Sequence, residues 1–309
     1  LGVSADDIES ETGTLALPEM GTRFVRQMLM DAKPKNFSDV LQIMGLSHGT
    51  DVWLGNAQEL IRSGTCALSE VIGTRDDIMV YLMQKKQLPP KTAFKIMEMV
   101  RKGKGLTAEL EELMRKYGVP DWYIDSCKKI KYMFPKAHAA AYGMAAIRMG
   151  WFKLYHPLAF YSVYFSVRGD GVDGMAVARG RGCVRDRIAA LKALGSDVTQ
   201  RDADSLTALL LVNEAMARGI RFLPVDLYKS HAYRYLVEDG AIRLPLSSLA
   251  GVGESAAAAI VAAREEEPFF SCDDIKDRAG VSKAVIETLR QAEALADLPE
   301  SSQLSLFGV

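Results

Sequence analysis

Three residues near the middle of the chain have side chains suited to a phosphorylated ligand that carries a base. His138 and Tyr142 are four residues apart, so on a helix that starts near Lys136 they share one face. A lysine can contact a phosphate, a tyrosine ring can stack on a base for about 1–3 kcal/mol, and a histidine can give a hydrogen bond or a proton to a phosphate oxygen. The alternative is that His138 and Tyr142 are core residues with satisfied polar tips. Because 137 and 139–141 are all alanines, which leave room for a ligand, we favour the ligand-facing interpretation.

A second group of cations follows a predicted helix. Arg101, Lys102 and Lys104 alternate with glycines and form a flexible cationic loop, for which a solvated lysine-rich turn is the alternative. The loop opens a basic segment, 101–168, with a net charge of +7 and interleaved Tyr and Trp residues. This segment suits a polyphosphate or a nucleic-acid backbone, or it is only a solvated basic surface. The whole chain has a net charge of −1 because 251–309 has a net charge of −6.

A third candidate anion site lies earlier in the chain. Ser47 and His48 precede a glycine and a helix that we expect to start at Asp51. A glycine turn at a helix N-terminus can hold an anion on its free amides. Simple capping of the same helix by Thr50 is the alternative.

The elements that position these residues are predicted to be mainly helical. Apolar residues spaced by three and four indicate helices at 19–31, 36–45, 51–62, 75–86, 90–102, 107–117, 120–131, 136–167, 175–194 and 203–218. Asn36, Thr50 and Thr107 are candidate helix caps. The segment 232–246 holds Asp239-Gly240, which favours a type I′ turn, and it is the one good β-hairpin signal.

A glycine-rich turn near the C-terminus resembles a helix-hairpin-helix motif. In 248–266, Gly251-Val252-Gly253 precedes an amphipathic helix in which Ser255 lies in the first turn. Such glycines let the backbone turn tightly, and the free amides at the helix start then face a phosphate. The alternative is an ordinary pair of helix caps. Because backbone amides make the contact, an acidic net charge does not forbid DNA binding.

A weaker second copy lies in 272–295, with Gly280 and Ser282 in its hairpin. Paired motifs of this kind form compact modules that hold duplex DNA by its sugar–phosphate backbone and read no sequence. Whether the second copy contacts DNA directly is left open.

The last residues form an apolar tail after a polar linker. Gln303, Leu304, Leu306 and Phe307 resemble the bacterial sliding-clamp-binding motif, in which a glutamine makes hydrogen bonds and leucine and phenylalanine fill an apolar pocket. Burying each large apolar side chain is worth about 1.5–3 kcal/mol. The alternative is a tail that folds back on its own core.

Other features of the chain bound its class. The four cysteines are far apart and form no C-x-x-C pair, so we expect no zinc or other metal site. The chain has neither an initial Met nor a signal peptide, nor an apolar stretch long enough to cross a membrane. We therefore expect a cytoplasmic protein with no membrane partner, and a piece of a longer chain.

Four long segments together identify a family. Residues 45–61, 71–82, 95–107 and 127–149 are similar to the PolC-type alpha subunit of bacterial DNA polymerase III, a C-family replicative polymerase. The resemblance runs from about Thr12 to Phe307. It implies a mainly α fold: a helical fingers domain and then a tandem helix-hairpin-helix domain with a small β-hairpin.

The resemblance also implies a division into domains. We expect a fingers domain at 1–168, a helical linker subdomain at 169–240, a tandem helix-hairpin-helix domain at 241–298 and a clamp-binding tail at 299–309. The partners implied are primer–template DNA, the sliding clamp and other replisome subunits.

The resemblance assigns roles to the candidate residues as well. Arg101, Lys102 and Lys104 are expected to contact the triphosphate of the incoming dNTP, and Ser47 and His48 to touch nucleotide or template. Lys136, His138 and Tyr142 are expected to meet the nucleotide and the nascent base pair. The palm, which holds the catalytic aspartates and Mg²⁺, precedes this segment in the family, so we expect no catalytic residue and no cofactor here, and no activity of this chain alone.

Two other functions remain as alternatives. One is a stand-alone helix-hairpin-helix adaptor that binds DNA and the sliding clamp, and the other is a helical scaffold with a basic surface. An adaptor has no need of the long segments at 45–61 and 127–149. A scaffold would not bind duplex DNA even at low salt.

Overall fold

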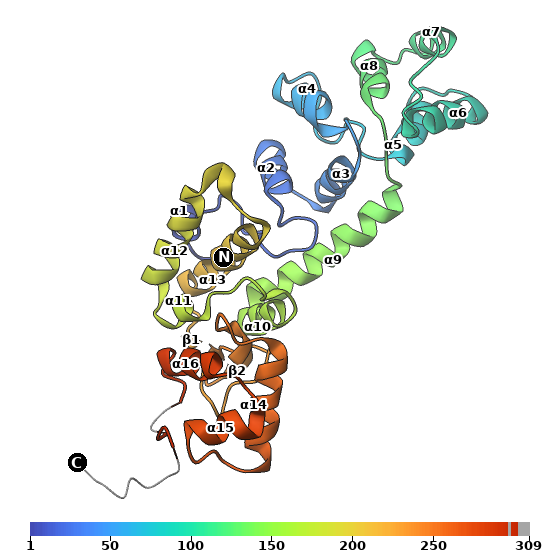
Figure 1. The fold of residues 1–309 in the computed structure, drawn as a ribbon. Helices are drawn as coiled ribbons and strands as arrows, with labels where there is room; N and C mark the ends of the chain where they lie inside the picture. Colours follow the sequence, from blue (N-terminus) through green and yellow to red (C-terminus); the bar gives the residue numbers. More distant parts are fainter. Residues whose placement is uncertain (296–297, 302–309) are drawn as a thin grey trace, which may run out of the picture. The chain divides into compact units, whose positions relative to one another are not determined.

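The computed structural model describes residues 1–295 and 298–301, and they divide into two compact units (Figure 1). One unit runs from Thr12 to Gly150 and is called here the 12–150 unit. The other combines Leu1–Glu11 with the chain from Trp151 onward and is called the C-terminal unit. Both units are mainly helical, and the only sheet in the described residues has three short strands. The predicted fold class, mainly α with a small β-hairpin, is confirmed.

The 12–150 unit consists of helices and two wide π-type turns around one apolar core. Its elements are α2 (Arg23–Ala32), α3 (Phe37–His48), η1 (Trp53–Ala57), α4 (Gln58–Arg62), α5 (Arg75–Val80), η2 (Tyr81–Lys85), α6 (Pro90–Arg101), α7 (Ala108–Lys116), α8 (Asp121–Lys129) and the first part of α9 (Lys136–Tyr155). Asn36 and Thr107 cap α3 and α7 as predicted, each accepting a hydrogen bond from the backbone amide three residues on. Ile43, Ile78 and Ile96 lie fully buried in the core.

The segment 51–62 is not the single helix that its spacing predicts. Leu54, with a ψ of 134°, and Gly55, with a φ of +66°, are not helical and lie within η1, so the regular helix of this segment is only the short α4. Thr50 does not cap this segment. Its backbone forms an isolated β-bridge with Tyr132, in which the Thr50 N–H donates to the Tyr132 carbonyl oxygen at 2.9 Å.

The predicted helix 136–167 is two helices. α9 (Lys136–Tyr155) ends before His156, and α10 (Pro157–Arg168) begins immediately after it. His156 has φ −132° and ψ 55°, outside the helical region, because a residue that precedes proline is sterically excluded from it. The compact units divide at Gly150, within α9, whereas the predicted fingers domain extends to 168.

The C-terminal unit consists of helices and a small sheet. Its elements are α1 (Ala5–Ile8), α10, α11 (Gly174–Ala178), α12 (Arg181–Ala193), η3 (Gly195–Asp197), α13 (Gln200–Ala217), β1 (Phe222–Leu223), β2 (Leu236–Glu238), β3 (Ala241–Arg243), η4 (Leu246–Ser248), α14 (Glu254–Glu266), α15 (Cys272–Ala279) and α16 (Lys283–Gln291). α12 and α13 pack along each other, and α1 packs on α13. Arg181 joins α1 to α12, because its guanidinium lies 3.2 Å from an Asp7 carboxylate oxygen.

The sheet has the strand order β1-β3-β2, with β1 parallel and β2 antiparallel to β3. Asp239 and Gly240 connect β2 and β3 with φ values of +49° and +71°. Two consecutive positive φ values are the geometry of the predicted type I′ turn. The hairpin prediction is therefore confirmed, and β1 adds a third strand to it.

A buried ionic network lies in the C-terminal unit. The Lys153 ammonium is 2.7 Å from the Glu214 carboxylate, and the two side chains are 1% and 0% exposed. The Tyr161 hydroxyl donates to the same Glu214 oxygen at 2.6 Å and accepts from Arg218 at 3.1 Å. Burial lowers the pKa of Lys153, while Glu214 raises it, and burial together with Glu214 raises the pKa of Tyr161 far above its usual range. The network joins the end of α9 to α10 and α13.

Candidate nucleotide and nucleic-acid interface

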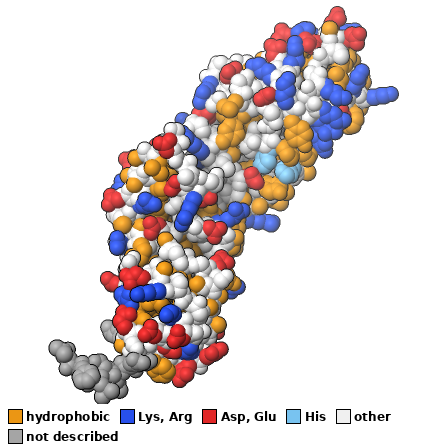
Figure 2. Space-filling model, viewed as in Figure 1, with side chains coloured by type: hydrophobic (Ala, Val, Ile, Leu, Met, Phe, Trp, Pro, Cys, Tyr) orange, Lys and Arg blue, Asp and Glu red, His pale blue; other side chains and the backbone are white. Residues whose placement is uncertain are grey.

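Four aromatic rings form a cluster on the 12–150 unit and bring together residues from α3, α9 and the segment before α9. The His138 ring centroid lies 4.5 Å from that of Tyr142, 5.0 Å from that of Phe134 and 5.3 Å from that of His48. Tyr142 is 41% exposed. Figure 2 shows histidine side chains bordered by hydrophobic ones on the face in view. We call His48, Phe134, His138 and Tyr142 the aromatic cluster.

The alanines beside the cluster have two roles. Ala139, Gly143 and Ala146 are buried and face α3, and a Cβ on Gly143 would lie 3.5 Å from the Leu41 side chain. These small residues let α9 pack closely on α3, so our interpretation of Ala139 as room for a ligand is wrong. Ala141, which precedes Tyr142, is exposed and leaves the approach to its ring open.

His48 does not lie where the sequence places it. Ser47 and His48 form the last turn of α3, and no helix N-terminus follows them directly, so the reasoning for an anion site on free amides is wrong. The His48 Nδ1 lies 2.6 Å from the Met44 carbonyl oxygen, to which it must donate, and its Nε2 lies 3.5 Å from a Glu19 carboxylate oxygen. His48 therefore reaches the aromatic cluster through its ring, with both nitrogens engaged.

Lys136 lies at the start of α9 beside two aspartates of α5. Its Nζ is 3.0 Å from Asp77 Oδ1, and its backbone N–H donates to Asp76 Oδ2 at 2.7 Å. The other Asp77 oxygen accepts the Thr74 N–H and closes a capping box on α5. The Lys136 side chain remains half exposed, so an approaching phosphate can compete with Asp77 for it.

The aspartates of α5 do not fit a metal site, because backbone amides and Lys136 already hold their oxygens. Within the part of the chain that the structure describes, no three His, Cys, Asp or Glu side chains are grouped to bind a metal ion.

The predicted cationic loop is partly neutralised by one carboxylate. Glu98 accepts hydrogen bonds from both Arg101 and Lys102; the Lys102 ammonium is 2.8 Å away. The Arg101 guanidinium and then Lys102 lower the pKa of Glu98 to about 2. Because the folded pKa is depressed from 4.5, these ion pairs contribute stability above pH 4.5 and lose it as the pH falls toward 2. Lys104 has no such carboxylate partner among the described residues.

The loop and the aromatic cluster are linked by the segment that precedes α9. Gly103 packs on Lys131, so closely that a Cβ on Gly103 would lie 2.5 Å from the Lys131 carbonyl oxygen. The next residue, Tyr132, makes an edge contact with Phe134, with centroids 5.2 Å apart. Phe134 and the partner Glu98 were missed by our sequence analysis. The phenylalanine could have been noticed from its place four residues before His138.

The first helix-hairpin-helix copy has the backbone that its glycines predict. Gly251 has a φ of +92°, Val252 is buried, and Gly253 is the exposed residue that precedes α14. The first amides of a helix have no partner within it, and Gly253 has no side chain to cap them. With Ser255 exposed in the first turn, the α14 start presents free N–H groups to solvent.

The second copy repeats this geometry with one difference. Gly280 has a φ of +63°, and Val281 is buried as Val252 is. Ser282 takes the place of Gly253, and its side chain accepts a hydrogen bond from the Val285 N–H at the start of α16. One donor of this hairpin is therefore already used. α15 packs on both α14 and α16.

The predicted clamp-binding residues Gln303, Leu304, Leu306 and Phe307 lie outside the described residues. Among the helices that the structure describes, none is long and apolar enough to cross a membrane.

Two families of known proteins match the chain. Residues 7–118 match the finger domain of the bacterial DNA polymerase III alpha subunit. Residues 219–304 match the helix-hairpin-helix motif. The class of protein that the chain resembles is thus one in which a finger domain of the bacterial DNA polymerase III alpha subunit is followed by helix-hairpin-helix motifs.

The relatives refine this class. The chain is 52% identical over 308 residues to DNA polymerase III PolC-type of Clostridium perfringens, which covers all of this chain and 21% of the relative. It is 53% identical over 307 residues to the protein of that name from Bacillus subtilis, and the match covers 99% of this chain and 21% of that relative. Over nearly its whole length, the chain is similar to a C-terminal part of PolC-type DNA polymerase III. It spans about a fifth of the length of these relatives.

Proposed function

We propose that this chain is the part of a replicative DNA polymerase that receives the incoming dNTP, holds the primer–template duplex and tethers the enzyme to the sliding clamp. The observation that carries the proposal is the joining of His48, His138 and Tyr142 into one aromatic cluster with Lys136 at its side. Residues 127–149 also belong to the segments that resemble the polymerase. The catalytic Mg²⁺ ions belong to a palm outside this chain, and the protein acts in the cytoplasm at the replisome.

Within the cluster each side chain has a distinct task. The exposed Tyr142 ring offers a face to the base of the nascent pair, and His138, stacked beside Phe134, holds that ring in place and can donate to a phosphate oxygen. Lys136 and Arg101 are the cations available for the triphosphate once their carboxylate partners are displaced. Phosphoryl transfer depends on this kind of positioning and charge neutralisation.

The helix-hairpin-helix motifs hold duplex DNA through backbone amides in this proposal. The α14 start is uncapped, exposed and preceded by a flexible glycine, which suits a phosphate oxygen. The α16 start keeps fewer free donors because Ser282 caps it. The first copy is therefore the stronger contact.

Proline at 254 tests the first copy directly. Residue 254 is the first of α14, where proline is tolerated, and Gly253, with φ −71° and ψ 160°, already has the backbone that a residue before proline adopts. Glu254→Pro thus removes one N–H and leaves the helix intact, and Glu254→Gln removes the same charge but keeps the N–H. We expect the proline variant to bind a short duplex about three- to tenfold more weakly than the glutamine variant, measured by fluorescence anisotropy at low salt.

The same change in the second copy serves as the comparison. We expect Lys283→Pro to bind duplex only slightly more weakly than Lys283→Ala, because Ser282 already occupies part of that site. Equal duplex affinities for Glu254→Pro and Glu254→Gln would contradict the proposed role of the α14 amides.

The tail supplies the tether to the clamp in this proposal. Leu306→Ala together with Phe307→Ala removes two apolar anchors, each worth about 1.5–3 kcal/mol, so we expect clamp affinity to fall at least about a hundredfold. Surface plasmon resonance with immobilised clamp measures the loss, and Val309→Ala, outside the motif, is the control. Undiminished clamp binding by the double variant would overturn this assignment.

A stand-alone adaptor is the weaker candidate. Its hairpins and tail would behave alike in the two tests above, but it gives the finger-domain match over 7–118 no function. A primer-extension assay separates the two. We expect the chain to be inactive alone and to extend a primer when it is joined to the preceding palm.

A further inference from the structure

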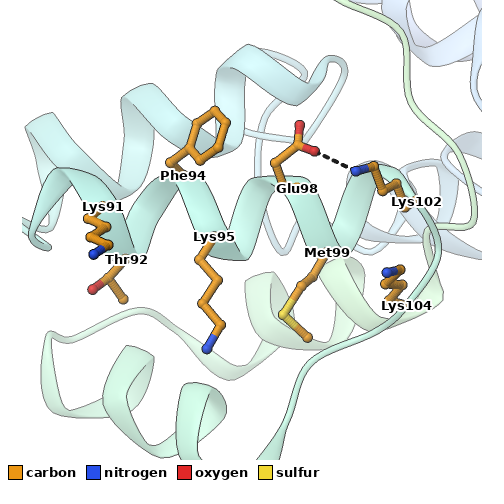
Figure 3. A pocket seen from close by; sticks show the side chains of 8 residues that line it. All are labelled: Lys91, Thr92, Phe94, Lys95, Glu98, Met99, Lys102 and Lys104. Atoms are coloured by element: carbon orange, nitrogen blue, oxygen red, sulfur yellow. Dashed lines mark ion pairs between the residues drawn. The ribbon is translucent and has the colours of Figure 1, made fainter.

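A groove of about 520 Å³ lies along α6, and no role has been assigned to it (Figure 3). Its lining is Lys91, Thr92, Phe94, Lys95, Glu98, Met99, Lys102 and Lys104. All but the last two belong to α6 itself. Four lysines therefore face one glutamate across a shallow surface that also carries an aromatic ring.

The one carboxylate of the groove leaves most of its lysines unneutralised. Glu98 is already held by Lys102 and by Arg101. Among the described residues, no carboxylate lies within ion-pairing distance of Lys91, Lys95 or Lys104. Figure 2 shows Lys and Arg side chains gathered over the part of the 12–150 unit that holds α6 to α8. Among the described residues, the groove thus offers three lysines that no carboxylate neutralises.

The two sides of the groove differ in chemistry. Figure 3 shows Lys95 and Met99 extending from one side of α6, and Phe94 and Glu98 from the other. Phe94 is 50% exposed, so that much of its ring is accessible to a ligand. Cations on one side and a free aromatic face on the other match a ligand whose phosphates and bases lie on opposite sides.

We propose that this groove binds single-stranded nucleic acid, which in the polymerase is the unpaired template strand. Lys91 and Lys95 are one helical turn apart, about 6 Å along α6, and contact phosphates of the strand. Phe94 stacks on the face of an unpaired base. In a duplex that face is covered by the neighbouring base pairs. The proposal rests on the proposed function for the identity of the strand, but its binding chemistry stands on the groove alone.

An acidic peptide would also meet the lysines, but it has no base for Phe94. The contribution of Phe94 therefore distinguishes the two ligands. Glu98 tests the charge of the groove in the opposite direction, since it neutralises Lys102 at the edge of the same groove. Removing its charge frees a cation and should strengthen the binding of a nucleic-acid strand.

The test uses the whole chain and a fluorescein-labelled oligothymidylate, with affinity measured by anisotropy over a salt series. We expect Lys91→Gln with Lys95→Gln to lower affinity about tenfold and to reduce the salt slope by about 1.4, which is two lost single-strand phosphate contacts. Phe94→Ala should lower affinity about fivefold or more at an unchanged slope. Glu98→Gln should raise the affinity.

The matched control replaces two exposed lysines of the same unit outside the groove, Lys35→Gln with Lys116→Gln. If this control loses as much affinity as the Lys91 and Lys95 variant, or if Phe94→Ala binds as the parent does, the proposal is overturned. The duplex test at Glu254 is independent. If the Glu254 variants bind duplex equally well, the proposed function is contradicted, but the oligothymidylate result is not affected. If the groove variants bind oligothymidylate as the parent does, the groove proposal is overturned, but the duplex result is not affected.

Discussion

Replacement of Glu214 with alanine should destabilise the C-terminal unit by about 3–5 kcal/mol, the largest stability loss we expect from any single change described above. The reason is that Lys153, 1% exposed, would lose the Glu214 carboxylate that lies 2.7 Å from its ammonium, and the Tyr161 hydroxyl would lose its acceptor. Lys153→Ala should cost a comparable amount, because it leaves the Glu214 carboxylate buried. Amide hydrogen exchange in α10 and α13 measures the loss of stability within this unit. A single melting temperature for the whole chain would combine the unfolding of both units.

The double variant Lys153→Met with Glu214→Leu is the informative comparison. It removes both charges and retains apolar volume, so it should lose less stability than either single alanine variant. The exposed pair Lys192–Glu9 in the same unit is the matched control, and Glu9→Ala should cost less than about 1 kcal/mol. Additive losses in the double variant would show that the two buried charges do not depend on each other.

Loss of the Tyr142 ring should lower kcat/KM for the incoming dNTP about tenfold to a hundredfold in the full-length polymerase, since stacking on a base is worth about 1–3 kcal/mol. Tyr142→Phe keeps the ring and should stay within about threefold of the parent. His138→Ala should weaken the same step, because His138 packs against Tyr142 with centroids 4.5 Å apart. Lys136→Ala should raise KM for the nucleotide. Steady-state primer extension at varied dNTP measures all four variants.

Tyr117, exposed at the end of α7 and outside the aromatic cluster, provides the control. Tyr117→Ala should leave the kinetics unchanged. Parental constants for both Tyr142→Ala and His138→Ala would contradict the placement of the nascent base pair at the cluster. Circular dichroism confirms that each variant is folded, so that a kinetic loss cannot be attributed to unfolding.

Local patterns in the sequence predicted much of this fold. Asn36 and Thr107 cap helices because their side chains satisfy amides only three residues away. Asp239-Gly240 forms its turn because both residues tolerate a positive φ. The hairpin glycines Gly251 and Gly280 adopt positive φ for the same local reason.

The errors arose where distant residues decide the structure. Thr50 forms a β-bridge with Tyr132, which is distant in the sequence, and no local sequence pattern predicts such a bridge. Its neighbour His48 closes a helix instead of preceding one, yet it still meets His138, because α3 packs against α9. The sequence predicted that the loop carries cations. It did not predict that Glu98 neutralises two of them, because that contact depends on side-chain geometry and not only on residue spacing. In contrast, proximity to Pro157 could have predicted the break at His156.

Glu98 and Asp77 have a consequence for how tightly this protein can hold DNA. Each acts as a resident counterion, bound to Arg101 and Lys102 in one case and to Lys136 in the other. When a phosphate displaces such a carboxylate, the freed carboxylate takes up a cation in place of the one that the phosphate gives up, so that exchange gains little of the entropy that normally drives polyanion binding. A surface of this kind exchanges one phosphate for the next at small cost, which suits the proposed role in an enzyme that advances along its template.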